Sequence, residues 1–417
     1  MAASNGPDPT GAVLAELLSP AGLADPYAIY HRLRAERDAG RDLGRLVIDH
    51  AGAIEVLADR SLSSDRVTST LRPLGEAERA SLDPLERTLR AIVAFTDPPD
   101  HRRLRRLLQG AFTPGVVHDS EPAMRRLAEG LLDELDASAE IDLQRDFSYR
   151  LPALVVGSLL GVEPDRERDF ARWARQIVLF FGTGRPDLAL ARETREHLLE
   201  ARAYLGELAE RRRRHPTGDL LSAMVASQER EGGLTQDELL ANALFLMTAG
   251  HETVANQITN GLVALLRHPD QAELVRRDPS LVDGAVEEIL RYDSAIQVTA
   301  RLAERDRTVL GRPFARGEAV VVLLGAANRD PARFPEPDRF DIRRGQNQPL
   351  SFAFGAHYCL GAALARAELR IGIPLVLERL GELELVDPVL GYQPTLDFRG
   401  PTALRVRRQG VPFPAGS

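Results

Sequence analysis

The sequence predicts a mainly α-helical protein with a minor β part. Between about residues 119 and 269, apolar residues recur at spacings of three and four, and Gly/Pro-rich turns such as FFGTGRPD and RHPTGD separate the runs. Strand-like segments are short and few, the clearest being GRLVID, TVLG and EAVVVLL. Neither a repeat nor a low-complexity linker divides the chain. We therefore expect a single domain over residues 1–417, with a short flexible N-terminus (about residues 1–10).

Composition and charge exclude several classes of protein. The chain has 417 residues, a formal net charge of −8 and a single cysteine. One cysteine cannot form an intrachain disulfide or a four-cysteine metal site, and the acidic balance argues against a general nucleic-acid binder. No apolar run approaches the roughly 18 residues that a membrane helix needs, and the N-terminus lacks the pattern of a secretory signal. We expect a cytoplasmic protein that binds neither membrane nor nucleic acid.

The longest expected helix is LTQDELLANALFLMTAGHETVANQITNGLVALLRHP. It begins at a capping box formed by Thr235 and Glu238 and ends at Arg267, before a His-Pro pair. Its length of about 30 residues, roughly 45 Å at 1.5 Å per residue, would cross a whole domain. Because most of its faces are apolar, we expect it to be central. The small and polar TAGHET segment in its middle predicts that something other than side-chain packing occupies the space beside it.

The lone cysteine, Cys359, stands in SFAFGAHYCLG, and a helix-like run follows it. This position at a helix N-terminus favours a thiolate, because unpaired N–H groups and the helix dipole stabilise negative charge there. Gly355 and Gly361 remove side chains on both sides of the sulfur, as a flat, bulky partner would require. Taken alone, the cysteine could be a buried structural thiol, a nucleophile with the poorly placed His357 as base, or a haem ligand.

The whole pattern, Phe-x-x-Gly-x-His-x-Cys-x-Gly from Phe352 to Gly361, favours haem ligation. With it, the sequence resembles the cytochrome P450 haem-thiolate monooxygenases of the soluble bacterial type over nearly its whole length. The resemblance implies the triangular, helix-rich fold with small β-sheets, and haem b with Cys359 as the iron ligand and Phe352 and Gly361 in the haem loop. It also implies electrons from NAD(P)H through a reductase and a ferredoxin or flavodoxin-type donor, a small-molecule substrate and a monomer.

An ion pair is expected between two residues of AVEEILRY. Glu288 and Arg291 lie at i, i+3 on one helix face, where they can pair. Taken alone, such a pair is most often a surface feature. The family pattern adds Arg339, in FPEPDRFD, as the third member of a buried structural network.

Two cationic residues share one helix face in DPPDHRRLRRLLQGAF. His101 and Arg105 lie at i, i+4 and therefore point the same way, although a solvated basic face is the alternative interpretation. In similar proteins, residues at these positions bind the haem propionates together with Arg301 and His357, through charge-assisted hydrogen bonds.

The other arginines of this helix are expected on its outer face, near the cysteine side of the haem. They are Arg102, Arg103 and Arg106. An exposed basic cluster on an acidic protein suits an acidic electron donor such as a ferredoxin.

The segment AGHET is expected to complete the site. Ala249 and Gly250 lack bulk, so that a small ligand and a substrate could lie against the helix, while Glu252 and Thr253 offer an acid and a hydroxyl for proton delivery. A mid-helix threonine can instead bond only to the carbonyl four residues earlier. The resemblance assigns the catalytic role to Glu252 and Thr253, since the family uses an acid and an alcohol to protonate dioxygen, and it gives His251 no role.

The resemblance places the substrate along residues 176–184, 244–249, 295–298 and 396–398. The residues expected to contact it are Phe180, Phe181, Leu244, Ala295, Ile296, Val298 and Phe398. This apolar lining implies a monooxygenase that inserts one oxygen atom into a mostly apolar small molecule, in bacterial secondary metabolism. The alternatives are a haem-thiolate sensor and a catalytically silent partner of another enzyme. The cysteine argues against the silent partner, and the acid–alcohol pair argues against the sensor.

Overall fold

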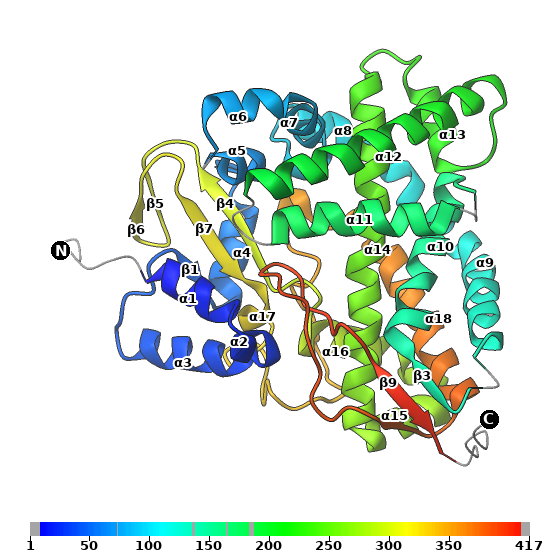
Figure 1. Cartoon of the computed structure of the whole chain (residues 1–417). Coiled ribbons are helices and arrows are strands. Elements are labelled where there is room, and N and C mark those ends of the chain that lie inside the picture. The colour runs from blue at the N-terminus through cyan, green and yellow to red at the C-terminus, as the bar shows by residue number, and fades with distance from the viewer. Residues whose placement is uncertain (1–8, 73, 136–137, 164–165, 183–186, 410–417) are drawn as a thin grey trace.

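The computed structural model describes residues 9–409 except 73, 136–137, 164–165 and 183–186. Helices dominate the structure, as the sequence predicts (Figure 1). The first nine are α1 (Thr10–Leu17), α2 (Pro20–Ala24), α3 (Pro26–Asp38), α4 (His50–Ala58), α5 (Arg66–Leu71), α6 (Glu76–Ser81), α7 (Asp83–Arg90), α8 (Asp100–Leu108) and α9 (Pro114–Asp133). The others are α10 (Arg150–Leu160), α11 (Glu167–Gly182), α12 (Leu188–Arg214), α13 (Leu220–Ser227), α14 (Gln236–Arg267), α15 (Pro269–Arg277), α16 (Val282–Tyr292), α17 (Leu324–Ala327) and α18 (Ala362–Leu380).

The β part is small, and it includes the three expected strand segments. The strands are β1 (Leu46–Val47), β2 (Leu62–Ser63), β3 (Glu140–Asp142), β4 (Val298–Ala303), β5 (Arg307–Val309), β6 (Arg312–Phe314), β7 (Ala319–Leu323), β8 (Leu383–Leu385) and β9 (Arg405–Arg408). The main sheet has the order β1-β7-β4-β2, and β4 runs antiparallel to β7 with Arg301 opposite Val320. The two smaller sheets are β3-β9-β8 and β5-β6.

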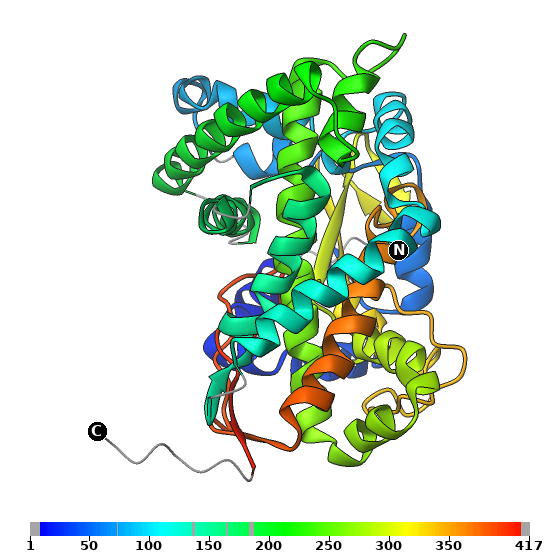
Figure 2. The ribbon, with the colours of Figure 1, turned by 90° about the vertical axis from the view of Figure 1, so that its right-hand side faces the viewer.

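Helix α14 passes through the middle of the molecule, between α11 and α12 on one side and α18 on the other (Figures 1 and 2). Its 32 residues, about 48 Å at 1.5 Å per residue, begin at the expected capping box. In that box, the Glu238 N–H donates to Thr235 Oγ1 at 3.2 Å, and the Thr235 N–H donates to Glu238 Oε2 at 2.9 Å. Neither α14 nor any other helix in the described part of the chain is long and apolar enough to cross a membrane.

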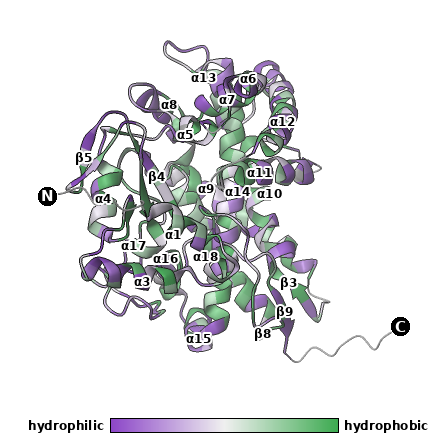
Figure 3. Cartoon of the chain, turned by 60° about the vertical axis from the view of Figure 1, so that its left-hand side comes forward, coloured by the Kyte–Doolittle hydropathy of each residue, from purple (hydrophilic) through white to green (hydrophobic). Residues whose placement is uncertain are grey.

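The interior contains two large hydrophobic clusters, and α14 contributes to both of them. Its first half, with Leu240 and Met247, packs with buried residues of α11 and α12, and its second half, with Val254 and Ile258, packs with α9 and α18. The apolar residues along these helices face inward, and polar residues cover the outside (Figure 3). Residues 248–253 belong to neither cluster. Within the TAGHET segment, Ala249, Gly250 and Thr253 line a cavity, whereas Thr248, His251 and Glu252 are buried in the protein.

Candidate active site

The cysteine loop lies between the end of α4 and the start of α18. The Cys359 N–H donates to the Phe352 carbonyl at 3.0 Å, which closes the loop, and α18 begins three residues later. A Cβ at Gly361 would meet no atom within 4 Å, so the space beside it is open. Gly355 serves another purpose: its φ is +76°, and a Cβ there would lie 2.6 Å from the Leu57 carbonyl oxygen. The expectation that both glycines make room beside the sulfur holds only for Gly361.

Two opposing effects act on the thiol of Cys359. Desolvation raises its pKa, whereas the Gly361 N–H and the charges of Arg105 and Arg366 act in the opposite direction. The residue is exposed to the cavity, where a partner can reach the sulfur. A coordinated metal ion would deprotonate the thiol outright. The sulfur is thus suited to a metal partner rather than to nucleophilic attack without one.

Four basic side chains line the same cavity as Cys359: His101, Arg105, Arg301 and His357. The two imidazole rings are 4.0 Å apart. Burial, together with the charges of His101, Arg301 and Arg105, lowers the pKa of His357 to about 3, and burial lowers the pKa of Arg301 to about 10. Such a desolvated group of donors is unfavourable without an anion.

One buried atom of this group supports the same conclusion. His101 Nδ1 has no hydrogen-bond partner among the described residues. Arg105 donates to the Tyr358 carbonyl at 2.7 Å, which positions its guanidinium beside the cysteine loop. His101 therefore presents an unpaired ring nitrogen to the cavity, beside the guanidinium groups of Arg105 and Arg301, as the carboxylates of a ligand would require.

The rest of the cavity is mostly apolar. It has a volume of about 320 Å³, and its walls include Val93, Phe95, Phe245, Leu246, Ile296, Leu324 and Phe352. An apolar slot with a thiol on its floor and four cationic donors at one edge fits the parts of haem: a flat hydrophobic ring, an iron and two propionates. These residues consequently fit the cofactor that the resemblance implies.

Helix α14 forms the wall above the cysteine. Ala249, Gly250 and Thr253 line the cavity, and Thr253 Oγ1 donates to the Ala249 carbonyl at 2.6 Å. Thr253 therefore makes the back-bond and also lines the cavity. Glu252 points elsewhere: it is buried beside the cavity and accepts a hydrogen bond from Gln393 Nε2 at 2.8 Å. His251 lies 2.8 Å from the Tyr149 carbonyl through Nε2 and does not line the cavity.

The expected substrate residues are only partly at the cavity. Ala295 and Ile296 line it, whereas Leu244, Val298 and Phe180 are buried in the hydrophobic clusters. Phe181 lies behind Phe95, at 4.8 Å between ring centroids, and Phe398 pairs with Ile296 beside a neighbouring pocket. Residues 183–184 of the expected lining lie outside the described residues.

Periodicity explains these differences and could have predicted the residues that line the cavity. Counting back by four from Thr253 along α14 reaches Ala249 and then Phe245, both of which line the cavity, and Leu244 lies on a different face. In β4, the lining residues Thr299 and Arg301 alternate with Val298, which faces the opposite side of the strand.

The acidic member of the buried network, Glu288, has two arginine partners. Arg291 donates to it through Nε and Nη2, each at 2.8 Å, and Arg344 donates through Nε at 3.1 Å. The prediction that Arg339 is the third member is wrong. Its side chain is 62% exposed and pairs with Glu336, because it lies on the outside of the turn; only its carbonyl accepts from Arg291 and Arg344.

Of the three arginines expected on the outer face of α8, Arg102 and Arg106 are exposed as predicted and Arg103 is not. Arg103 forms an ion pair with Glu238 and donates to the Gly233 carbonyl at 3.2 Å, so it joins α8 to the start of α14. Arg102 and Arg106 are exposed and line a second cleft, together with Arg60. None of these three forms an ion pair with any described residue.

A buried acid on α18 has no counterpart in the sequence-based expectations. Glu368 lines the cavity, and neither of its carboxyl oxygens has a hydrogen-bond partner in the described part of the chain. Burial raises its pKa well above the ordinary value of 4.5. Composition and spacing do not distinguish it from Glu378, the exposed acid of the same helix.

This acid should make stability depend on pH. Above about pH 4.5 the unfolded chain releases the proton that folded Glu368 keeps, so the free energy of unfolding should fall as pH rises toward the folded pKa, by about 1.4 kcal/mol per pH unit. Glu368→Gln should lose this slope, whereas Glu378→Gln, on an exposed part of α18, should keep it. Urea unfolding between about pH 5 and 7 measures the slopes; equal slopes for wild type and Glu368→Gln would contradict the assignment.

The comparisons with known proteins agree with this geometry. The family model described as "Cytochrome P450" matches residues 67–385. The chain is 36% identical over 382 residues to "Biotin biosynthesis cytochrome P450" of Bacillus subtilis, covering 90% of this chain and 94% of that protein. It is 40% identical over 397 residues to "Cytochrome P450 monooxygenase PikC" of Streptomyces venezuelae, covering 92% and 91%.

A solved structure shows the same fold. The crystal structure of P450BioI in complex with hexadec-9Z-enoic acid ligated acyl carrier protein has a TM-score of 0.85 and 34% identity, covering 94% of this chain and 99% of that one. The family model, the relatives and the fold together define a haem protein. The chain belongs to the cytochrome P450 family, and it is a monooxygenase.

Proposed function

We propose that this monooxygenase holds haem b with Cys359 as the iron ligand and oxidises apolar small molecules of bacterial secondary metabolism. The observation that carries the assignment is the cavity itself: one thiol on its floor and four cationic donors at its edge. His101, Arg105, Arg301 and His357 would bind the propionates. Phe352, Ala249 and Gly361, which also line the cavity, would contact the ring.

The bound haem would supply the iron at which dioxygen is reduced. The side chains of this chain perform the remaining tasks. Thr253 presents a hydroxyl to the cavity. The neighbouring Glu252, which is buried beside the cavity, has a carboxyl group that can resupply the proton that this hydroxyl gives up. Phe95, Phe245 and Ile296 exclude water and hold an apolar substrate beside Thr253.

A binding experiment tests the substrate class. Hexadec-9Z-enoic acid, bound to a carrier protein in the related structure, is a suitable probe because its chain is long and apolar. Adding it to the purified haem-loaded protein should shift the absorption band of the haem as the ligand displaces water. Phe245→Asp should weaken this binding, since it places a charge in the apolar wall. Tight binding of small polar ligands in place of apolar ones would contradict the proposal.

The electron donor is proposed to be an acidic ferredoxin that docks at the second cleft, supplied from NAD(P)H by a reductase. Arg60, Arg102 and Arg106 give this cleft an exposed positive rim, and its inner wall contains Arg105 and His357. Complementary charge accelerates association, and salt weakens the effect.

Reversing one of these charges should slow reduction. Arg106→Glu is expected to lower the second-order rate of reduction by a ferredoxin roughly tenfold at low ionic strength, with unchanged affinity for an apolar ligand. Arg192→Glu, an equal change on an exposed position of α12, should have little effect. Stopped-flow reduction measures both rates. If the two variants are reduced equally fast, the donor docks elsewhere.

A further inference from the structure

Glu252, the acid next to Thr253, accepts a hydrogen bond from a residue near the C-terminus, Gln393. Gln393 Nε2 donates to Glu252 Oε1 at 2.8 Å and also lies 3.4 Å from Asn256 Oδ1, one helical turn further along α14. Gln393 belongs to the C-terminal loop, residues 388–402, which crosses α14 (Figure 1). The contact therefore joins Glu252 of α14 to a part of the chain 141 residues away.

No cation holds Glu252. Among the described residues it takes part in no ion pair, and its Oε2 has no hydrogen-bond partner, although the side chain is only 2% exposed. A titratable neighbour is Tyr149, whose pKa is raised by burial, by the charge of Glu252 and by a side-chain hydrogen bond with it. A buried carboxyl without a cationic partner depends on its neutral donors for its orientation. Gln393 and Tyr149 are such donors.

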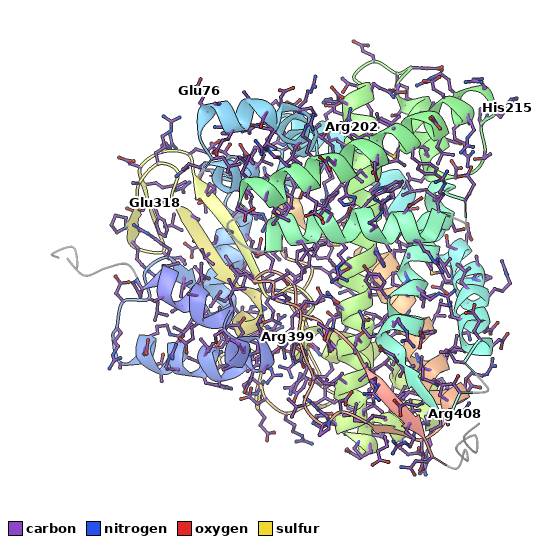
Figure 4. The ribbon with its side chains drawn as sticks, in the orientation of Figure 1. Glu76, Arg202, His215, Glu318, Arg399 and Arg408 are labelled. Atoms are coloured by element: carbon purple, nitrogen blue, oxygen red, sulfur yellow. The ribbon has the colours of Figure 1, made fainter. Side chains whose placement is uncertain are left out.

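The loop that carries Gln393 is firmly attached. Arg399 is buried, donates to Asp293 Oδ1 at 2.8 Å and to the Leu23 carbonyl at 2.6 Å, and stacks over the Tyr392 ring at 3.9 Å (Figure 4). A Cβ at Gly400 would lie 2.1 Å from Asn256 Oδ1, so the loop backbone presses directly on α14. These contacts give the Gln393 amide a defined position relative to Glu252.

Gln393 also lines a small pocket between the C-terminal loop and helices α1–α3, together with Leu23 and Tyr30. The same residue thus contacts the buried acid and borders this pocket, whereas Thr253, next to the acid in α14, lines the haem cavity.

We propose that Gln393 is a positioning residue for oxygen activation: it holds Glu252 through Oε1, so that Oε2 stays available to pass protons to the Thr253 side of α14. The inference rests on the proposed role of Glu252 as the acid. It assigns to the C-terminal loop a part in orienting this acid.

The test compares three variants in the haem-loaded protein with a ferredoxin, its reductase and NADH. Gln393→Leu removes the donor, Gln393→His restores an N–H, and Thr395→Val disturbs the same loop, where Thr395 Oγ1 donates to the Phe398 carbonyl, without touching Glu252. Gln393→Leu should raise the fraction of reducing equivalents recovered as hydrogen peroxide roughly tenfold, because proton delivery fails. Gln393→His should recover most of the loss, and Thr395→Val should resemble wild type.

A second measurement does not depend on turnover. The infrared band of the Glu252 carboxyl, identified by its loss in Glu252→Gln, should shift in Gln393→Leu and stay in place in Thr395→Val. Unchanged peroxide yield and an unchanged band in Gln393→Leu would overturn the inference while leaving the monooxygenase assignment intact. A wild-type protein that bound no haem would overturn the proposed function itself.

Discussion

Replacing Arg344 with leucine should destabilise the protein by about 3–5 kcal/mol, because it leaves the buried Glu288 carboxylate with one cation in place of two. Glu288 is fully buried and also accepts hydrogen bonds from the Asp341 N–H at 2.9 Å and from Asn347 Nδ2 at 3.0 Å. Removing one partner of a buried charge costs more than the pair contributes, since the remaining charge is not solvated. The affected region lies against the cysteine loop, so haem content should fall as well.

Arg339→Leu is the matched control. It removes the same charge five residues earlier, from a side chain that is 62% exposed, and should change the free energy of unfolding by no more than about 0.5 kcal/mol. Urea unfolding of the two variants measures the difference. If Arg339→Leu were the more damaging, the assignment of Arg344 to the network would be wrong.

Thr253→Ala should uncouple electron consumption from product formation. The hydroxyl lines the cavity and is the side chain of α14 that can donate a proton there, so its loss should lower the yield of oxidised product per NADH by about 100-fold, within the usual range for a general acid. NADH oxidation should continue, with hydrogen peroxide as the main product. Binding of an apolar ligand should be unaffected, because the hydroxyl adds little to the apolar wall.

The same helix contains a control for this substitution. Thr248 also back-bonds, donating to the Leu244 carbonyl at 3.0 Å, but it is buried away from the cavity. Thr248→Ala removes the same group from the same kind of helical position and should leave coupling unchanged. Equal uncoupling in both variants would show that the effect arises from helix packing and not from the Thr253 hydroxyl.

The site residues that could be predicted are those in short local motifs. The cysteine loop from Phe352 to Gly361 and the His101–Arg105 pair depend on spacing along one segment, and the structure brings them to one cavity. Thr253 follows from its position in α14. In each case the backbone geometry of a single turn or helix face determines where the side chain points.

The residues that could not be predicted depend on contacts between distant segments. Arg344 rather than Arg339 reaches Glu288 because of the way the chain turns between α17 and α18. Arg103 forms an ion pair with Glu238 on another helix. Gln393 approaches Glu252 from the C-terminal loop. No periodicity within one segment encodes these pairings, so a single sequence read by itself does not reveal them.

The most direct test of the central claim is the absorption spectrum of the purified protein, reduced and exposed to carbon monoxide, for wild type and Cys359→Ser. The account predicts haem in wild type with a Soret band at the red-shifted position that thiolate ligation produces. In Cys359→Ser that band should be absent while the protein remains folded. A spectrum that is indifferent to Cys359, or a wild-type protein that takes up no haem, would contradict the account.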